Sequence, residues 1–418
     1  MSRVLIYTSP ARGHLYPMMD VALELQRSGH DVVVQTLAGE RERLAEAGVR
    51  HRAIAPAIEE LELVDYRASN PLARILAAFD TWLARAPHEV DDLRAACAEL
   101  APDLLVVDAN TWGAAAFAES LGRPWAMFMP YALPLASPDT PAFGLGLAPP
   151  RHALDRLRDR VLRGVQNRVT RSRFQRLDRL RLGLGVPGVG RFDGIFARPD
   201  VVLYRTAVPF DYSRAQWPGN VHPIGPGLWA PPGEAPAWLR ELPRPRTLVS
   251  VSTEMQDDGA IIDAALQGLA DEAGSVVVTS AALDPSAFTP PHDRARVTRV
   301  LPHAAVVGEV DVVVTHGGMG TTQRALAAGV PVVVVPWGRD QAETARRAEL
   351  SGAGVMLPRA TLTPVRLREA VRRARARKGQ AQAVARAFRE AGGAARAVSL
   401  LEGLMVGDDA EAEVRRVA

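Results

Sequence analysis

The sequence predicts an α/β protein made of two doubly wound parallel-sheet domains that face each other across a cleft. Three observations lead to this prediction. The chain has 418 residues, more than one hydrophobic core usually supports. Short apolar runs alternate with helical patterns in both halves, an order that gives parallel strands joined by right-handed crossovers. A stretch rich in Pro and Gly at residues 217–245 separates the halves and predicts a linker.

We therefore expect four segments. They are a first domain at residues 1–216, the linker at 217–245, a second domain at 246–395 and a helical tail at 396–418. The tail is expected to pack back on the first domain.

The first half repeats a strand–helix pattern. Its apolar runs predict strands at residues 4–9, 31–36, 49–54, 104–108, 125–129 and 201–206. Helical spacing predicts helices at residues 17–28, 40–47, 72–100 and 112–121, the first with Pro17 in its first turn and Gly29 at its end. Residues 58–71 are expected to form a loop, and five prolines within residues 132–150 predict a mobile loop.

A long helix rich in Arg is expected at residues 152–182. Apolar residues fall at helical spacing along it, among them Leu154, Leu157, Val161 and Val165. Such a helix could bind a membrane surface or a protein partner. It could equally be an ordinary surface helix with a solvated Arg face, which is the simpler interpretation.

The second half repeats the same alternation. Strands are predicted at residues 247–252, 275–279, 297–301, 312–315 and 332–335. Helices are predicted at about residues 259–270, 304–309, 321–328, 341–351 and 363–376, with more helix to about residue 405.

A glycine-rich turn follows the predicted strand Val312–Val314. It runs Thr315-His316-Gly317-Gly318-Met319-Gly320-Thr321-Thr322, with Thr321 or Thr322 at the expected helix N-cap. Glycines let a ligand approach the backbone, and a helix N-terminus offers free N–H groups to an anion such as a diphosphate. His316 can add a hydrogen bond or a charge, and Asp340 and Gln341 follow the next strand to the same sheet edge. Many α/β turns contain Gly and Thr without binding anything, so the converging polar residues carry the prediction.

The first strand ends in Thr8-Ser9-Pro10-Ala11-Arg12-Gly13-His14. The G-x-G-x-x-G pattern of dinucleotide folds is absent there, so we expect no nicotinamide or flavin cofactor. His14 can act as a general base near neutral pH, and Asp108, at the end of another strand, can orient it. A lone His at a strand end often has only a capping or packing role, but the position of Asp108 favours the base.

Composition narrows the class of protein. Cys97 is the only cysteine, which excludes an internal disulfide and a cysteine metal site. No apolar run is long enough for a membrane span, and the N-terminal residues lack a signal-peptide layout. The net charge of +3 gives no reason to expect nucleic acid as a partner. We expect a cytoplasmic protein with no stable membrane insertion, monomeric or homodimeric.

Several motifs resemble those of glycosyltransferase family 1, the UDP-glycosyltransferase superfamily of the two-domain GT-B fold. They are Gly13-His14-x-x-Pro17, Thr315-His316-Gly317-Gly318-x-Gly320-Thr321-Thr322, Ala327-x-Gly329-Val330-Pro331, and Pro336 followed by Asp340-Gln341. The resemblance covers nearly the whole chain and is strongest to actinobacterial enzymes that glycosylate macrolides and other polyketide-type natural products.

The resemblance implies an inverting, metal-independent transfer of a sugar from a nucleotide-diphosphate sugar to an acceptor in the N-terminal domain. His14 would be the catalytic base and Asp108 its support. The residues implied to bind the donor are Gly13, Ser252, Thr253, Leu301, His316, Gly318, Gly320, Thr321, Asp340 and Gln341. No cofactor is implied, since the nucleotide-sugar is a co-substrate.

Three positions depart from the family pattern. Arg324 stands where many relatives have a Glu that contacts ribose, Thr344 where many have an Asn, and Val300 where plant relatives stack a Trp on the base. The nucleotide is therefore left between dTDP and UDP, with a lean to dTDP from the natural-product resemblance.

The acceptor is expected to be a hydrophobic small molecule, with a polyketide-type or aromatic compound favoured. Candidate lining residues are aromatic: Phe79, Trp82, Trp112, Phe128 and Tyr131. Core packing is the simpler role for each of them except Trp112, which lies close to Asp108 in sequence. Alternative functions are a catalytically silent nucleotide-sugar-binding partner protein and, more remotely, a nucleotide-sugar epimerase.

Overall fold

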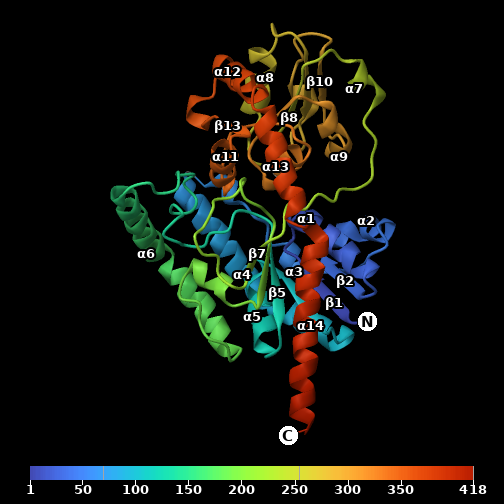
Figure 1. Cartoon of the computed structure of the whole chain (residues 1–418), viewed down its shortest axis with the longest axis vertical. Coiled ribbons are helices and arrows are strands. Elements are labelled where there is room, and N and C mark those ends of the chain that lie inside the picture. Colours follow the sequence, from blue (N-terminus) through green and yellow to red (C-terminus); the bar gives the residue numbers. More distant parts are fainter. Residues whose placement is uncertain (69, 254, 418) are drawn as a thin grey trace.

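The computed structural model describes residues 1–68, 70–253 and 255–417, with residues 407–417 described by their backbone only. It shows two α/β domains, each built on a parallel sheet, with the C-terminal domain above the N-terminal one in Figure 1. The predicted fold class is confirmed.

Within the described residues, the N-terminal sheet has seven parallel strands in the order β3-β2-β1-β4-β5-β6-β7. They are β1 (Arg3–Tyr7), β2 (Asp31–Thr36), β3 (Arg50–Ala53), β4 (Leu104–Asp108), β5 (Trp125–Met129), β6 (Val201–Tyr204) and β7 (Val221–Pro223). The helices of this domain are α1 (Arg12–Arg27), α2 (Arg41–Glu46), α3 (Pro56–Glu59), α4 (Pro71–Leu100), α5 (Trp112–Ser120) and α6 (Ala153–Gly183).

Over the same described part of the chain, the C-terminal sheet has six parallel strands in the order β10-β9-β8-β11-β12-β13. They are β8 (Arg246–Ser250), β9 (Ser275–Thr279), β10 (Ala295–Thr298), β11 (Val312–Thr315), β12 (Val332–Val334) and β13 (Gly354–Met356). Its helices are α7 (Ala237–Glu241), α8 (Ala260–Gly268), α9 (His303–Val306), α10 (Met319–Ala327), α11 (Gln341–Leu350), α12 (Pro364–Arg375), α13 (Lys378–Glu390) and α14 (Gly393–Val417).

Two helix starts differ from the sequence prediction. Helix α1 begins at Arg12, so the predicted start at Pro17 is wrong. Pro17 lies inside the helix, where its lack of an N–H costs one hydrogen bond without stopping the helix. Helix α10 begins at Met319 with Gly318 at the N-cap, so neither Thr321 nor Thr322 is the cap. The Thr322 hydroxyl instead donates to the Gly318 carbonyl at 2.9 Å from within the first turn.

Strands β7 and β13 were not predicted. Strand β7 lies in the segment expected to be linker, yet it pairs with β6 in the register Val202↔Val221 and Tyr204↔Pro223. The chain therefore leaves the first sheet only after Pro223. The predicted loop at residues 58–71 contains the last two residues of α3 and a short 3-10 turn at Asp65–Arg67.

Helix α14 connects the two domains. It runs from the C-terminal domain along the N-terminal domain (red in Figure 1), where it packs on α1. Ala397, Val398 and Leu401 are buried in the same cluster as Leu15 and Met18 of α1. The tail thus contributes to the N-terminal core.

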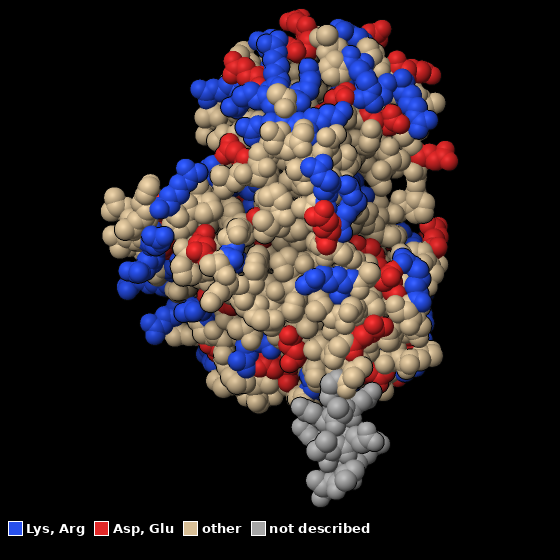
Figure 2. All heavy atoms as spheres, viewed as in Figure 1, with Lys and Arg blue, Asp and Glu red and all other residues tan. Residues whose placement is uncertain are grey.

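Helix α6 lies at the outer edge of the N-terminal domain, at the left of Figure 1. Arg side chains line that edge in Figure 2. Leu154, Leu157, Val161 and Val165 are exposed on its first turns, while Phe174 and Leu177 bury its second half. Across the described part of the chain, none of the helices combines the length and apolar character needed to cross a membrane.

Candidate active site

His14 and Asp108 meet at the carboxyl ends of strands β1 and β4. The His14 Nδ1 atom lies 2.8 Å from Asp108 Oδ2 and 3.0 Å from Oδ1. Strands β1 and β4 are neighbours in the sheet, with Tyr7 opposite Val107, and this pairing brings the two segments together. The pair that the sequence predicted as base and support is therefore in direct contact.

The Asp108 carboxylate is fully buried and fixed by its neighbours. The Asn110 backbone N–H donates to its Oδ1 at 2.7 Å, and the Ser9 hydroxyl donates to its Oδ2 at 3.3 Å. These bonds orient the carboxylate toward His14. An oriented carboxylate on Nδ1 fixes the imidazole tautomer in which that nitrogen carries the proton.

The other ring nitrogen of His14 is the one that can act on a ligand. Nε2 lies 3.4 Å from Asn110 Nδ2, and the Tyr131 ring is 5.7 Å from the His14 ring. The Tyr131 hydroxyl donates to Asn110 Oδ1 at 2.7 Å. The His14 side chain keeps 17% exposure, whereas Asp108 has none.

The position of His14 in α1 differs from the expectation. It lies within the first helical turn, where its backbone N–H donates to the Ala11 carbonyl at 3.0 Å. Gly13 is exposed in the same turn. The imidazole therefore lies at the N-terminal end of α1.

The glycine-rich turn after β11 leads directly into helix α10, which begins at Met319. Gly317 adopts φ +102, and a Cβ there would lie 3.0 Å from Val334 and Gln341 atoms, so this position requires Gly. A Cβ on Gly318 would lie 2.8 Å from His316 Nε2, so Gly318 leaves room for the imidazole. Gly320 and Thr321 follow in the first turn of α10.

His316 is neutral in this structure. Its side chain is buried, and burial lowers its pKa to about 4, with Arg339 adding to the shift and the Ser250 backbone opposing it. At neutral pH this histidine can therefore offer a hydrogen bond to a ligand without a charge of its own.

Asp340 and Gln341 lie at the start of α11, and their side chains differ in accessibility. Burial raises the pKa of Asp340, and its own backbone N–H, then Arg339 and His14, oppose that shift. Gln341 is 3% exposed. Its Oε1 accepts from the backbone N–H groups of Trp337 and Gly338 at 2.8 and 2.9 Å, and its Nε2 donates to Gln256 at 2.7 Å.

The remaining donor candidates surround the turn. The Ser252 hydroxyl accepts from Gln256 at 2.9 Å, Thr253 is exposed, and Leu301 is partly buried against the C-terminal core. Val300 is 73% exposed. Arg324, where many relatives have a Glu, donates to the Leu228 and Trp229 carbonyls at 2.9 and 3.1 Å and so holds the linker.

The candidate acceptor residues separate into two groups. Phe79 and Trp112 are buried in the N-terminal core together with Phe174, and Phe128 is buried on the other face of the sheet. Trp82 is partly buried against that first cluster, 5.3 Å from the Trp112 ring. Tyr131 alone of these candidates lies beside His14.

Sequence reasoning did not single out Asn110 or Gln256. Asn110 contacts both members of the His14–Asp108 pair, and Gln256 connects Gln341 to Ser252. The signal for Asn110 was its place two residues after Asp108. Gln256 lies in an irregular segment that carries no comparable signal. In the described ranges, no group of three or more His, Cys, Asp or Glu side chains is placed to hold a metal ion.

Comparison with known proteins gives related sequences for both halves of the site. Residues 263–395 match the family model described as erythromycin biosynthesis protein CIII-like, C-terminal domain. The chain is 34% identical to 4'-demethylrebeccamycin synthase of Lentzea aerocolonigenes over 385 residues, 89% of this chain and 91% of that protein. A PGL/p-HBAD biosynthesis rhamnosyltransferase of Mycobacterium bovis is 34% identical over 192 residues, 46% of this chain and 42% of that protein.

Solved structures share the fold across nearly the whole chain. The glycotransferase of kitacinnamycin superposes with a TM-score of 0.75 at 24% identity, over 96% of this chain and 98% of that one. The calicheamicin glycosyltransferase CalG4 gives 0.73 at 22% identity, over 97% and 98%. The glycosyltransferase VinC in complex with dTDP gives 0.68 at 22% identity, over 96% and 99%.

Proposed function

The chain belongs to the GT-B glycosyltransferases of the natural-product type, within glycosyltransferase family 1, and from this we propose that it is an inverting, metal-independent sugar transferase. The donor is a nucleotide-diphosphate sugar, dTDP- or UDP-linked. The acceptor is a hydroxyl of a hydrophobic small molecule, of the polyketide or aromatic class.

One observation carries the proposal: the His14–Asp108 contact of 2.8 Å, which engages Nδ1 and not Nε2 of the imidazole. Nε2 takes the proton of the acceptor hydroxyl while its oxygen attacks the anomeric carbon. The bond from that carbon to the diphosphate oxygen breaks, and the nucleoside diphosphate leaves with the electron pair. Asp108 stabilises the imidazolium that forms, and general-base catalysis of this kind contributes roughly 10²–10⁴-fold in rate.

The leaving diphosphate gathers negative charge that the C-terminal domain must hold. The backbone N–H groups from Gly318 to Thr321, the N-terminal end of α10 and a hydrogen bond from His316 supply that stabilisation. Asp340, the N-cap residue of α11, binds hydroxyls of the donor sugar. Gln341, whose amide already holds the 337–338 backbone, contributes mainly by fixing Asp340.

The dTDP donor is favoured over UDP by the solved VinC complex, which holds dTDP. Tyr131 is the acceptor-contact residue that the proposal favours, because it lies beside His14. Phe79 and Trp112 belong to the hydrophobic cluster on which Tyr131 and Trp82 pack, so we assign a packing role to Phe79, Trp112 and Trp82.

The test uses the purified protein with dTDP- and UDP-sugars and a panel of macrolide, aromatic polyketide and flavonoid acceptors. Mass spectrometry should show a gain of one hexose or deoxyhexose on an acceptor for the wild type. The His14→Ala and Asp108→Asn variants should lose about 10²–10⁴-fold in kcat. His88→Ala, at an exposed position of α4, is the matched control and should transfer normally.

Equal transfer by His14→Ala and wild type to an alcohol acceptor would overturn the base assignment. Donor binding without transfer to any acceptor in the panel would overturn the acceptor class. Absence of donor binding would remove the basis of the whole proposal.

A further inference from the structure

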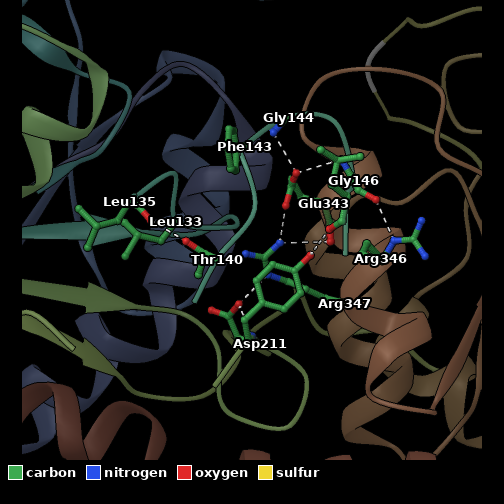
Figure 3. Close-up of polar contacts among 12 residues, drawn as sticks. Leu133, Leu135, Thr140, Phe143, Gly144, Gly146, Asp211, Glu343, Arg346 and Arg347 are labelled. Atoms are coloured by element: carbon green, nitrogen blue, oxygen red, sulfur yellow. Dashed lines mark hydrogen bonds and ion pairs between the residues drawn. The ribbon is translucent and has the colours of Figure 1, made fainter. Parts of the chain in front are cut away.

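Residues 132–150, which we call the strap, run from the catalytic side of the N-terminal domain to helix α11 of the C-terminal domain (Figure 3). The strap starts directly after Tyr131, the residue beside His14. Its first half is held by its own domain: Arg163 donates to the Ser137 carbonyl at 3.0 Å, and Gln166 donates to the Phe143 carbonyl at 2.7 Å. The segment that the sequence predicted to be mobile is thus anchored in this structure.

The second half of the strap is held by the other domain. Glu343 Oε1 accepts from the backbone N–H groups of Gly144 and Gly146 at 2.9 and 3.0 Å. Arg346, three residues after Glu343, donates from Nε to the Gly146 carbonyl at 2.8 Å. Three hydrogen bonds therefore fasten the strap to the first two turns of α11.

Glu343 is fixed from its other side as well. Its Oε2 accepts from Arg347 at 2.8 Å, and Arg347 Nε lies 2.6 Å from Asp211 Oδ1 of the N-terminal domain. The Arg347 guanidinium lies over the Tyr212 ring at 4.1 Å. These side chains are almost fully buried, and a buried charge without its partners would cost several kcal/mol. Glu343 is therefore held in a single position between the domains.

The strap backbone is shaped for this contact. Gly144 and Gly146 adopt φ +93 and +59, left-handed conformations that point both N–H groups at one oxygen. A Cβ on Gly146 would lie 2.6 Å from the Ala342 carbonyl oxygen. Any side chain at position 146 would push the strap away from α11.

Helix α11 also begins with the proposed sugar-binding residues. Gln341 is its first residue and Asp340 its N-cap, three residues before Glu343. In the proposed function Asp340 binds the donor sugar. The N-terminal end of α11 thus carries the sugar-binding residues, and Glu343 and Arg346 of the same helix hold the strap.

We propose that Glu343 is a positioning residue that couples the strap to the donor helix, so that acceptor enclosure and donor-sugar binding occur together. The inference rests on the proposed function. Residues 144 and 146 close the acceptor side only while Glu343 anchors them. Without the anchor, water replaces the acceptor hydroxyl: it attacks the anomeric carbon, the carbon–phosphate-oxygen bond breaks, and free sugar, nucleoside diphosphate and a proton are released.

The experiment compares transfer with donor hydrolysis in two variants that break the contact from opposite sides. Glu343→Ala removes the acceptor oxygen, and Gly146→Ala blocks the approach without touching the buried ion pairs. Each should raise the acceptor KM, and the ratio of hydrolysis to transfer, by about tenfold. Binding of the nucleoside diphosphate should stay within about twofold, because the turn at residues 317–321 is untouched.

Gly185→Ala is the matched control. Gly185 also adopts a left-handed conformation, φ +79, but a Cβ there meets nothing within 4 Å. This variant carries the same backbone strain as Gly146→Ala without the clash, so its hydrolysis ratio should equal that of the wild type. The double variant Glu343→Ala/Gly146→Ala should be no worse than the poorer single variant, since both changes break one contact.

Two results would overturn the inference. One is an equal fall of transfer and hydrolysis in Gly146→Ala, which indicates general damage. The other is full additivity in the double variant. Hydrogen exchange separates the inference from the proposed function, because it needs no substrate. Amides of residues 141–147 should exchange faster in Gly146→Ala and Glu343→Ala than in wild type and Gly185→Ala. Equal exchange rates in all four proteins would refute the strap anchor, whatever their activity. If the two variants exchange faster but the wild type transfers no sugar, only the proposed function is refuted.

Discussion

Asp108 and Glu89 are both fully buried, but the groups that surround the two carboxyls differ. Asp108 lies against His14 and accepts hydrogen bonds from the Asn110 backbone N–H and the Ser9 hydroxyl. Glu89 is fully buried in α4, where burial raises its pKa to about 8. The Gly113 N–H at 2.8 Å and Arg85 only partly oppose this shift, and the charge of Asp108 adds to it.

The raised pKa of Glu89 predicts that the stability of the protein depends on pH. The Glu89→Gln variant should lack this contribution. The ordinary pKa of 4.5 applies to the unfolded chain, and the folded value is about 8. The folded state therefore keeps a proton that the unfolded state loses. The stabilisation is complete below pH 4.5 and is lost as pH rises toward 8, a change of about 5 kcal/mol at most.

Urea unfolding of both proteins between pH 4.5 and 8.5 provides the measurement. The Gln side chain imitates the protonated form and does not titrate. As pH rises, the free energy of unfolding should fall in the wild type relative to Glu89→Gln, and the difference should become constant above pH 8. A constant difference across this range would show that Glu89 is ionised in the folded protein.

For single residues, the sequence predicted the His14–Asp108 pair but not the buried Glu89 behind it. His14 and Asp108 follow apolar runs, and parallel strands bring their ends to one edge, so their contact could be predicted. Glu89 lies in a long helix where nothing local distinguishes it from the exposed Glu99. Its burial depends on how α4 packs on α5, which is set by contacts distant in sequence.

Helices α4 and α5 pack so closely that one glycine decides the contact. A Cβ on Gly113 would lie 1.8 Å from the Ala86 carbonyl oxygen, a backbone atom that cannot move aside by itself. The Gly113 N–H also bonds Glu89. Because α5 follows Asp108 directly, this contact holds the support of the base in place.

Gly113→Ala should therefore lower the free energy of unfolding by about 3 kcal/mol or more, through overpacking. The matched control is Gly164→Ala in α6, where a Cβ meets nothing within 4 Å and Ala should stabilise the helix by about 0.5–1 kcal/mol. Chemical denaturation of the two variants measures the contrast. Equal stabilities would mean that α4 and α5 separate easily at Ala86.

The boundaries of elements were predictable where apolar runs are long and bounded. The ranges predicted for β2, β4, β5 and β9 match the structure residue for residue. Strands β7 and β13 were missed because each spans three residues, with Pro223 ending one and Gly354 starting the other. Such residues indicate turns, and only the neighbouring strand makes these segments part of a sheet.

For the whole molecule, the domains are joined at several places besides the linker. The strap reaches α11, Arg339 pairs with Asp65 at 2.8 and 3.0 Å, and Gln323 of α10 donates to the Arg205 carbonyl at 2.7 Å. Helix α14 adds an apolar contact behind the cleft. The packing of the tail on the first domain was expected from the sequence. The polar pairings were not, because each joins residues more than a hundred positions apart across two separately predicted domains.

The contact between α14 and the N-terminal domain can be used to test whether the two domains unfold together. Leu401 is fully buried among N-terminal residues although it belongs to a helix that extends from the C-terminal domain. Leu401→Ala should therefore destabilise by about 2–5 kcal/mol, the usual cost of such a truncation in a core.

Differential scanning calorimetry distinguishes a local from a shared effect. If α14 and the polar contacts couple the domains, the wild type unfolds in one transition, and Leu401→Ala shifts that whole transition to lower temperature. Val406→Ala, on the same helix at a side chain that is 68% exposed, should leave it within about 0.5 kcal/mol of the wild type. A second transition in the wild type, with only one of the two moved by Leu401→Ala, would mean that the domains unfold independently. The base on α1 and the donor turn on α10 would then be brought together by substrate rather than by the folded protein itself.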